Sequence, residues 1–402
     1  MKPQLQKFNF NRREFLWRFG GGLGGIAMTH LLGQQGLLAD TVAKPRADFN
    51  GGLHHPAKIK RVVQLFMNGG ASQCDTFDYK PELIKRSGEK FEPGERVEAA
   101  TSSPGNIMKS PWDWKQHGQS GRWVSSAFPH VATCVDDLTF LMAMASKTNV
   151  HGPGVYLQNS GFLLPGFPCM GAWISYGLGS MNENLPSFVV LPDSRGLPYN
   201  SKSSFSSGFL PVTHQGTIIK ATAPSPIADL FAPQSAKYIT KSSETDGLEL
   251  LKKLNREHLE KWQGDSRLDS RIASYELAAK MQLSAPEVLN LSGESDATKK
   301  LYGLENKESE DFGRNCLLAR RLLERGVRFV QVWSGTAGAT GNWDNHSDMT
   351  KELGFIAKST DQPVAALVKD LKSRGMLDDT LVIWTTEFGR MPFSQGSVGR
   401  DH

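Results

Sequence analysis

Short runs of consecutive apolar residues predict the strands of this chain. Four such runs are present, at 61–67, 188–191, 327–333 and 381–384. Turn-forming residues at 68–70 end the first run. Runs that are apolar at most positions, without a regular alternation, are typical of strands covered on both faces. The pattern therefore predicts buried strands of a mainly parallel sheet.

Apolar residues three and four positions apart predict helices between these strands. One helix is expected over 312–323 and another over 169–178. A further helix is expected to be opened by Asp361 and Pro363 and closed by Gly375. Helices that alternate with strands predict an α/β fold, with a mostly parallel sheet sandwiched by helices.

The segment 240–305 carries a different pattern, with apolar residues at helical spacing and charged residues between them. Leu248, Leu251 and Leu254 mark one amphipathic helix of this kind. We expect two or three such helices, forming a helical insertion or cap. The segment 88–122 is rich in Gly, Pro, Ser and charge, and it is expected to be a loop.

The N-terminal segment has the pattern of an export signal. Arg12 and Arg13, followed by Phe-Leu, resemble the twin-arginine signal, and a weakly apolar, glycine-rich stretch covers 19–38. We expect 1–39 to be a signal peptide, read by the twin-arginine translocase and cleaved near 39–43. An uncleaved membrane anchor stays open because no Ala-x-Ala site is present. The protein is accordingly expected in the periplasm or outside the cell.

Composition narrows the class of protein. Hydrophobic residues make up 39% and charged residues 22%, and the net charge of +5 is too mild to indicate a nucleic-acid partner. Cys74, Cys134, Cys169 and Cys316 form no Cys-x-x-Cys pair. A zinc ribbon is therefore excluded, whereas one or two disulfides stay open. The mature chain is long enough for one large domain, which we expect over 50–402.

Polar side chains follow the predicted strands, where parallel α/β sheets place their sites. Taken singly, each of these polar side chains could have a structural role only, as when an Asp side chain caps a turn. Together, carboxylates and imidazoles at strand ends suit zinc, calcium, manganese or magnesium. We therefore expect a divalent metal site formed by Asp75, His151, Asp344, His346, Glu387 and His402.

The segment 364–390 resembles the part of sulfatases in which a helix, a strand and a turn supply metal ligands. Sulfatases belong to the alkaline phosphatase superfamily, so the resemblance implies that superfamily's α/β core. The whole chain is also similar to the domain-of-unknown-function family DUF1501, through motifs at 64–70, 149–151, 387–390 and 399–402. Members normally continue past the last motif. We therefore expect a C-terminally truncated domain that lacks the last part of its sheet.

The resemblance implies a changed catalytic group. His151 stands where sulfatases have the nucleophilic Cys or Ser, and Val155 stands where they have a supporting Arg. A formylglycine mechanism is therefore excluded. Either His151 is a metal ligand beside a metal-activated water, which we favour, or it attacks directly and forms a covalent intermediate. Arg390 and Arg400 are expected to hold an anionic oxyacid through forked hydrogen bonds.

Two functions follow from these expectations. The first is an exported metal-dependent hydrolase of sulfate or phosphate esters, sulfatase-like but without formylglycine. Its substrate would be an anionic ester, for example a sulfated or phosphorylated carbohydrate. The alternative is a catalytically degenerate member that acts as a binding or cell-envelope protein. Asn68, Phe388 and Val155 favour the alternative, because they replace functional residues of the sulfatases.

Overall fold

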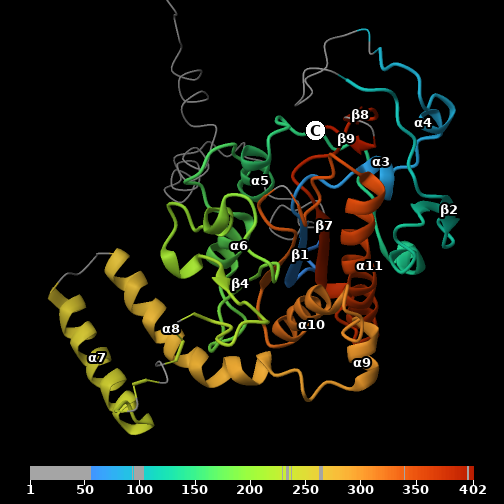
Figure 1. Ribbon diagram of the computed structural model, residues 1–402. Coiled ribbons are helices and arrows are strands. Elements are labelled where there is room, and N and C mark those ends of the chain that lie inside the picture. Colours follow the sequence, from blue (N-terminus) through green and yellow to red (C-terminus); the bar gives the residue numbers. More distant parts are fainter. Residues whose placement is uncertain are drawn as a thin grey trace, which may run out of the picture. The chain divides into compact units, whose positions relative to one another are not determined.

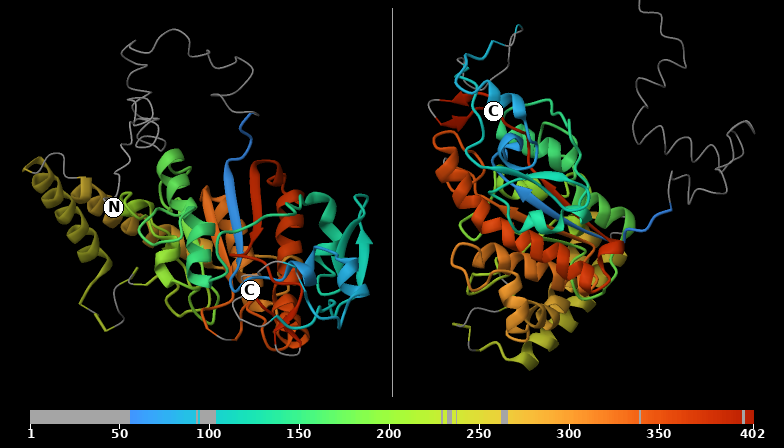
Figure 2. Two further views of the ribbon diagram at one scale, coloured as in Figure 1. Left: turned by 90° about the horizontal axis from the view of Figure 1, so that it is seen from above. Right: turned by 90° about the vertical axis from the view of Figure 1, so that its right-hand side faces the viewer.

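A five-stranded parallel sheet forms the centre of the fold, in the order β5-β4-β6-β1-β7 (Figure 1). Its strands are β1 (Arg61–Met67), β4 (Phe188–Leu191), β5 (Thr217–Ile218), β6 (Phe329–Ser334) and β7 (Thr380–Thr385). β1 pairs with β6 on one side and with β7 on the other, and Figure 2 shows blue β1 beside red β7. The four predicted strands and the α/β fold class are confirmed.

The structure is a computed structural model. It describes residues 56–92, 94, 104–228, 230–231, 235–236, 238–261, 266–338, 340–395 and 398–402. The sheet and its helices belong to the unit Ile59–His402. The signal segment expected at 1–39 lies outside the described residues. In the described part of the chain, no helix is both long enough and apolar enough to span a bilayer.

The side chains of β1 alternate between two apolar cores. Val63, Leu65 and Met67 lie in one core, and Val62 and Phe66 lie in the other. Successive residues of a strand point to opposite faces, so a strand covered on both sides is apolar at most positions. This requirement explains the largely apolar run that predicted β1, in which Gln64 is the buried polar exception.

Helices cover both faces of the sheet, as the sequence pattern predicted. One face packs against α10 (Glu310–Glu324) and α11 (Met349–Ser373). The other face packs against α5 (His151–Ser160) and α6 (Met170–Leu178). Figure 1 shows α5 and α6 on one side of the sheet and α10 and α11 on the other. The two layers of helices leave the carboxyl ends of the strands accessible to loops.

The start of α11 was predicted wrongly. The helix begins at Met349, and its N-cap residue Asp348 accepts a hydrogen bond from the backbone N–H of Lys351 at 3.1 Å. Pro363, which was expected to open the helix together with Asp361, lies inside it. Proline in a helix interior removes one backbone hydrogen bond. Burial of the apolar face on either side of Pro363 maintains the helix across this gap.

Asp361 has a different function from the predicted helix cap. Its carboxylate accepts hydrogen bonds from the backbone N–H groups of His130 and Val131, each at 2.8 Å. These groups lie at the start of the 3-10 helix η2 (Val131–Asp137), whose first N–H groups have no partner within the helix. Asp361 therefore caps a neighbouring helix rather than its own.

The segment 88–122 is not entirely loop, which corrects the prediction. β2 (Trp114–His117) and β3 (Arg122–Ser125) form an antiparallel pair. Tyr79 stacks on Trp123 with ring centroids 4.2 Å apart. Aromatic packing of this kind stabilises a short hairpin that the local composition does not predict.

Three helices lie in the described part of the range 240–305, where amphipathic helices were predicted. They are α7 (Lys241–Lys261), α8 (Ser266–Leu289) and α9 (Asp296–Leu301). Buried residues of α8, including Met281, Ala285 and Val288, join the core on the α10 side of the sheet. The second half of α8 is therefore part of the main fold.

The turn after β1 brings distant loops together at the carboxyl ends of the strands. Gly69 has a φ of +123°, and a Cβ there would lie 2.5 Å from the backbone nitrogen of Asp344. Only glycine combines this conformation with so close an approach. The loop that follows β6 is thereby held against the end of β1.

Candidate metal centre

Four side chains from three parts of the chain converge beyond the carboxyl ends of the strands. They are His151, Asp344, His346 and His402, and their ligand atoms all lie within 4.8 Å of one another. His151 is the first residue of α5. Asp344 and His346 lie in the loop after β6, and His402 follows β9 (Gly399–Arg400). The four residues could hold a metal ion, as predicted for each of them.

Asp344 lies at the middle of this cluster. Its Oδ1 is 2.7 Å from Nε2 of His346 and 3.2 Å from Nε2 of His402. Its Oδ2 is 3.2 Å from Nε2 of His151. All three histidines thus present the same ring nitrogen, Nε2, to one carboxylate.

The other ring nitrogen of each histidine meets an oxygen. Nδ1 of His151 lies 2.8 Å from Oε1 of Glu387, and Nδ1 of His402 lies 2.7 Å from the carbonyl oxygen of Asn149. Nδ1 of His346 contacts Oε1 of Gln395. These oxygens can accept a hydrogen bond from Nδ1, and this arrangement directs Nε2 of each ring towards Asp344. Metal-binding histidines are held in this way.

One nitrogen of the cluster is buried without a hydrogen bond. Nε2 of His151 has no hydrogen-bond partner among the described residues, although Oδ2 of Asp344 is only 3.2 Å away. Burying a polar atom unpaired is costly. Imidazole nitrogens together with a carboxylate are a common donor set for zinc. The donor atoms present therefore fit a divalent metal ion.

Contacts among the members of the cluster set the charge of Asp344. Burial raises its pKa, but its contacts with the three histidines and with Arg390 outweigh this effect, and the pKa lies far below its usual range. Burial lowers the pKa of His151, but Asp344 and Glu387 outweigh it and leave a raised pKa. The pKa of His402 is lowered, mainly by burial. Asp344 is thus an anion throughout the neutral range.

Aromatic rings fix the imidazole of His151. Tyr199 stacks on it with ring centroids 4.5 Å apart and an interplanar angle of 5°. Phe388 contacts the rings of His151 and His402, each with a centroid distance of 5.0 Å. Phe388 cannot bind a metal, as the sequence indicated, but it packs against two of the candidate ligands. No motif in the sequence pointed to Tyr199.

A strained turn next to Tyr199 holds the start of α5. Asn200 and Ser201 have φ values of 63° and 49°, a conformation that is uncommon for residues other than glycine. Nδ2 of Asn200 donates to the carbonyl oxygen of Gly152 at 2.7 Å. Strained residues of this kind cluster at functional sites because the surrounding contacts hold them in place. The turn fixes the residue that follows His151.

Buried amide groups tie α5 to the sheet below it. Nε2 of Gln331, on β6, donates to Oδ1 of Asn159 at 2.7 Å and to Oε1 of Gln64 at 2.9 Å. Asn159 lies near the end of α5, and Gln64 lies on β1. These hydrogen bonds fix the position of α5 along the sheet, and they thereby help to fix the position of His151.

Glu387 supports the cluster instead of joining it. Its Oε1 accepts the hydrogen bond from Nδ1 of His151 and a second one from the backbone N–H of Gly69, each at 2.8 Å. The side chain is fully buried. The prediction that Glu387 is a metal ligand does not agree with this arrangement. The carboxylate orients His151 from the side away from Asp344.

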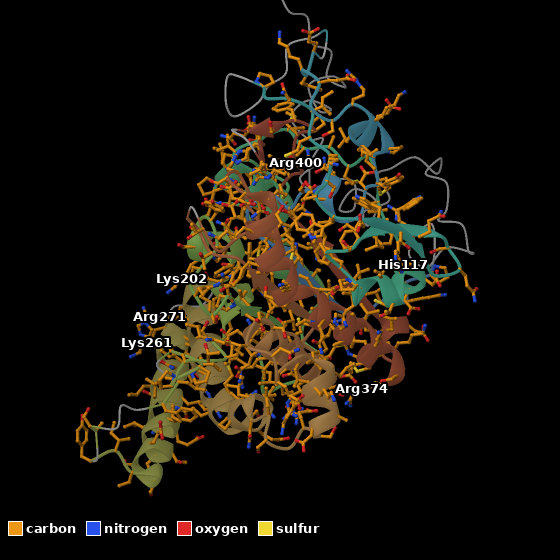
Figure 3. The ribbon with its side chains drawn as sticks, turned by 45° about the vertical axis from the view of Figure 1, so that its right-hand side comes forward. His117, Lys202, Lys261, Arg271, Arg374 and Arg400 are labelled. Atoms are coloured by element: carbon orange, nitrogen blue, oxygen red, sulfur yellow. The ribbon has the colours of Figure 1, made fainter. Side chains whose placement is uncertain are left out.

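Asp75 does not join the cluster either, which corrects its assignment as a ligand. Its Oδ2 is 2.5 Å from Nε of Arg400, and its Oδ1 is 3.1 Å from Nη2 of the same residue. The hydroxyl of Ser72 also donates to Oδ2, at 2.5 Å. The side chains of Asp75 and Arg400 are both fully buried. Asp75 and Arg400, the latter labelled in Figure 3, form a structural ion pair.

Arg390 is also engaged inside the protein. Its Nη2 donates to Oδ1 of Asp344 at 2.6 Å and to the carbonyl oxygen of Gly69, and its Nε donates to the carbonyl oxygen of Gly70 at 2.7 Å. The side chain is fully buried. Arg390 and Arg400 were both expected to hold an anionic substrate. Their donors are instead directed to groups of the protein.

The comparisons with known proteins identify a family and no individual relative. A family model described as "Protein of unknown function (DUF1501)" matches residues 59–402. No curated protein matches the chain, and no solved structure matches it. The matched range begins just before β1 and includes the whole His and Asp cluster.

Proposed function

Because the chain belongs to the DUF1501 family of proteins of unknown function, we propose an activity from its own site, as a metal-dependent hydrolase of sulfate or phosphate esters. The observation that carries the proposal is the convergence of three Nε2 atoms on the carboxylate of Asp344. The α/β core and the position of the site beyond the strand ends agree with the sulfatase-like branch of the alkaline phosphatase superfamily, which is part of the proposal.

The donor set favours zinc or a similar transition metal. Calcium and magnesium prefer sites built mainly from oxygen ligands, whereas imidazole suits zinc. His151, Asp344, His346 and His402 would hold the ion. A divalent ion there supplies Lewis-acid chemistry, polarising an ester oxygen and lowering the pKa of water. Glu387, Asn149 and Gln395 orient the histidines for binding.

The protein groups around the cluster also suit a negatively charged reacting group. α5 begins at His151, so the positive end of its dipole and its first N–H groups lie beside the cluster. Gly154 lets this end approach closely, since a Cβ there would lie 3.2 Å from Cβ of Glu387. The same helix end would stabilise charge on a sulfate or phosphate oxygen.

Of the two chemistries left open by the sequence, the geometry favours His151 as a ligand. Its Nε2 faces Asp344, while its Nδ1 is held by the buried carboxylate of Glu387. A nucleophilic nitrogen would instead have to face the ester. His151 therefore holds the ion rather than forming a covalent intermediate.

A second function is favoured by one specific observation. Arg390 and Arg400 donate to groups of the protein, so neither guanidinium is directed at a substrate. A catalytically degenerate member that binds a ligand in the cell envelope would not need them. In this alternative the protein still binds the metal ion but does not hydrolyse an ester.

Turnover distinguishes the two functions. The full chain, loaded with zinc, is assayed on aryl sulfates, aryl phosphates and sulfated or phosphorylated sugars, beside His151→Ala, Asp344→Ala and the control His117→Ala. His117 lies on the β2 hairpin and is labelled away from Arg400 in Figure 3. Turnover lost in the first two variants and kept in the control supports the hydrolase. Zinc binding without turnover of any ester supports the binding protein.

We also propose export through the twin-arginine route, from the pattern around Arg12 and Arg13. In a host with this pathway, the wild-type protein should reach the periplasm or the medium. Changing both arginines to lysine should keep it in the cytoplasm. Equal export of the two forms would contradict the proposal.

A further inference from the structure

The helix α7 presents an exposed apolar stripe. Leu250, Leu251 and Leu254 are 58%, 42% and 51% exposed. Together with Gly247, they follow the spacing i, i+3, i+4 and i+7, which places all four on one side of a helix. A Cβ on Gly247 would meet no atom within 4 Å, so the space beside it is open.

The stripe lies beside the surface that α7 uses within its own chain. α7 packs against α8, and its half-buried side chains Glu244, Asn255 and Leu259 mark that contact, so Leu251 lies at its edge while Leu250 and Leu254 point away from it. Figure 1 shows the two helices side by side as a hairpin. Adjacent leucines exposed to this extent mark a surface that binds a protein or a membrane.

Charges beside the stripe indicate what covers it. Acidic residues lie in the first half of α7 at Asp246 and Glu249, and basic residues follow at Lys252 and Lys253. Asp246 and Lys253 are seven residues apart, so they flank the stripe on the same side. An antiparallel copy of the helix would place each Asp246 beside the other copy's Lys253.

We propose that α7 is a self-association surface, on which a second copy of this chain packs its own α7 antiparallel. The contact is isologous, since each copy supplies the same stripe and the same two charges. Gly247 adds no side chain to this contact, so the helices can approach closely beside it. The charge pattern selects a second copy over a lipid surface, because a lipid surface would not require an acidic residue at Asp246 to balance Lys253.

The test measures association of the full chain by sedimentation velocity over a range of concentrations. The wild type should form a dimer, and Leu254→Glu should be a monomer with an unchanged circular dichroism spectrum. Asp246→Lys and Lys253→Asp should each weaken dimerisation by about tenfold or more, because like charges then face each other. The control Lys307→Asp changes an exposed charge outside α7 and should leave the dimer intact.

Mixing the variants makes the test independent of folding defects. Asp246→Lys and Lys253→Asp should each be largely monomeric alone and should form a heterodimer together, because both cross-pairs then join opposite charges. The double variant should recover dimerisation by itself. Any of three results would overturn the proposal. The wild type could be a monomer at every concentration, the charge changes could leave dimerisation unaffected, or the protein could bind anionic vesicles without forming a dimer.

Discussion

The Nε2 atoms of His346 and His402 lie 2.7 Å apart and face each other. Both rings direct Nδ1 to an oxygen acceptor, Gln395 for the first and Asn149 for the second. The guanidinium of Arg390 lies beside this pair, with its Nη1 3.2 Å from Nε2 of His346. Asp344 contacts both Nε2 atoms and adds negative charge, so a metal ion bound there would replace contacts that these side chains make with one another.

The first prediction concerns metal content. The purified wild type should contain about one divalent ion per chain, and His346→Ala should lose most of it, because the four ligands bind the ion more tightly than the remaining three. Metal analysis of dialysed protein measures this. His117→Ala should keep the wild-type content. Removing the ion with a chelator should lower Tm by at least about 4 °C, since a bound ligand stabilises the native state.

The second prediction tests Glu387 as an orienting group. Glu387→Gln keeps an oxygen to accept from Gly69 but removes the charge that holds Nδ1 of His151. Metal affinity should fall by about 10- to 100-fold with little loss of stability, as for other partners of metal-binding histidines. Calorimetric titration with zinc gives the affinity. Glu305→Gln, at an exposed position, is the matched control, and an equal effect in both variants would contradict the assignment.

The third prediction separates Asp75 from the metal site. Asp75→Asn leaves the buried guanidinium of Arg400 without its counter-charge and should lower the free energy of unfolding by about 3–5 kcal/mol. Urea denaturation measures the loss. The fraction that stays folded should keep its metal. Loss of metal with unchanged stability would instead identify Asp75 as a ligand.

The fourth prediction concerns the cysteines, for which the sequence left disulfides open. All four are free and buried. Burial raises the pKa of Cys74, Cys134 and Cys169, each to about 11, and raises that of Cys316 further. The native protein should therefore resist iodoacetamide at neutral pH, because the thiolate is the reactive form. Mass spectrometry should show four modified cysteines after unfolding without reductant, and a pair that stays unmodified would indicate a disulfide.

The fifth prediction concerns acid stability. Burial raises the pKa of Glu294, but hydrogen bonds from Arg320 and Arg321 outweigh it and lower the pKa below 4.5. A carboxyl with a lowered folded pKa stabilises the protein above its unfolded pKa, and this contribution is lost as pH falls through the folded pKa. Glu294→Gln should therefore be less stable at pH 7 and should lose less stability between pH 5 and pH 3. Thermal unfolding across this range tests the sign.

The strands were predictable because their signal is local. Burial on both faces requires apolar residues at consecutive positions, so β1 could be recognised from its own seven residues. The start of α11 was not predictable in this way. Pro363 is a common first residue of helices, and only the packing of the preceding turns shows that the helix continues through it.

The metal centre was predictable by residue type, but not the function of each member. His151, Asp344, His346 and His402 converge as expected. Asp75 has the same carboxylate chemistry, and what distinguishes it is a buried arginine 325 positions away. Partners so distant in the chain leave no local pattern. The same holds for Tyr199, whose contact with the ring of His151 depends on the strained turn that follows it.

The hydrogen bonds of Glu387 have a consequence for the order of assembly. They join residues 236 and 318 positions apart in the chain, to His151 and Gly69 respectively. During synthesis, His151 leaves the ribosome long before the carboxylate that orients it, and His402 follows later still. A nascent chain can therefore bind a metal ion only incompletely. Full metal occupancy would indicate that the chain has folded at least as far as His402.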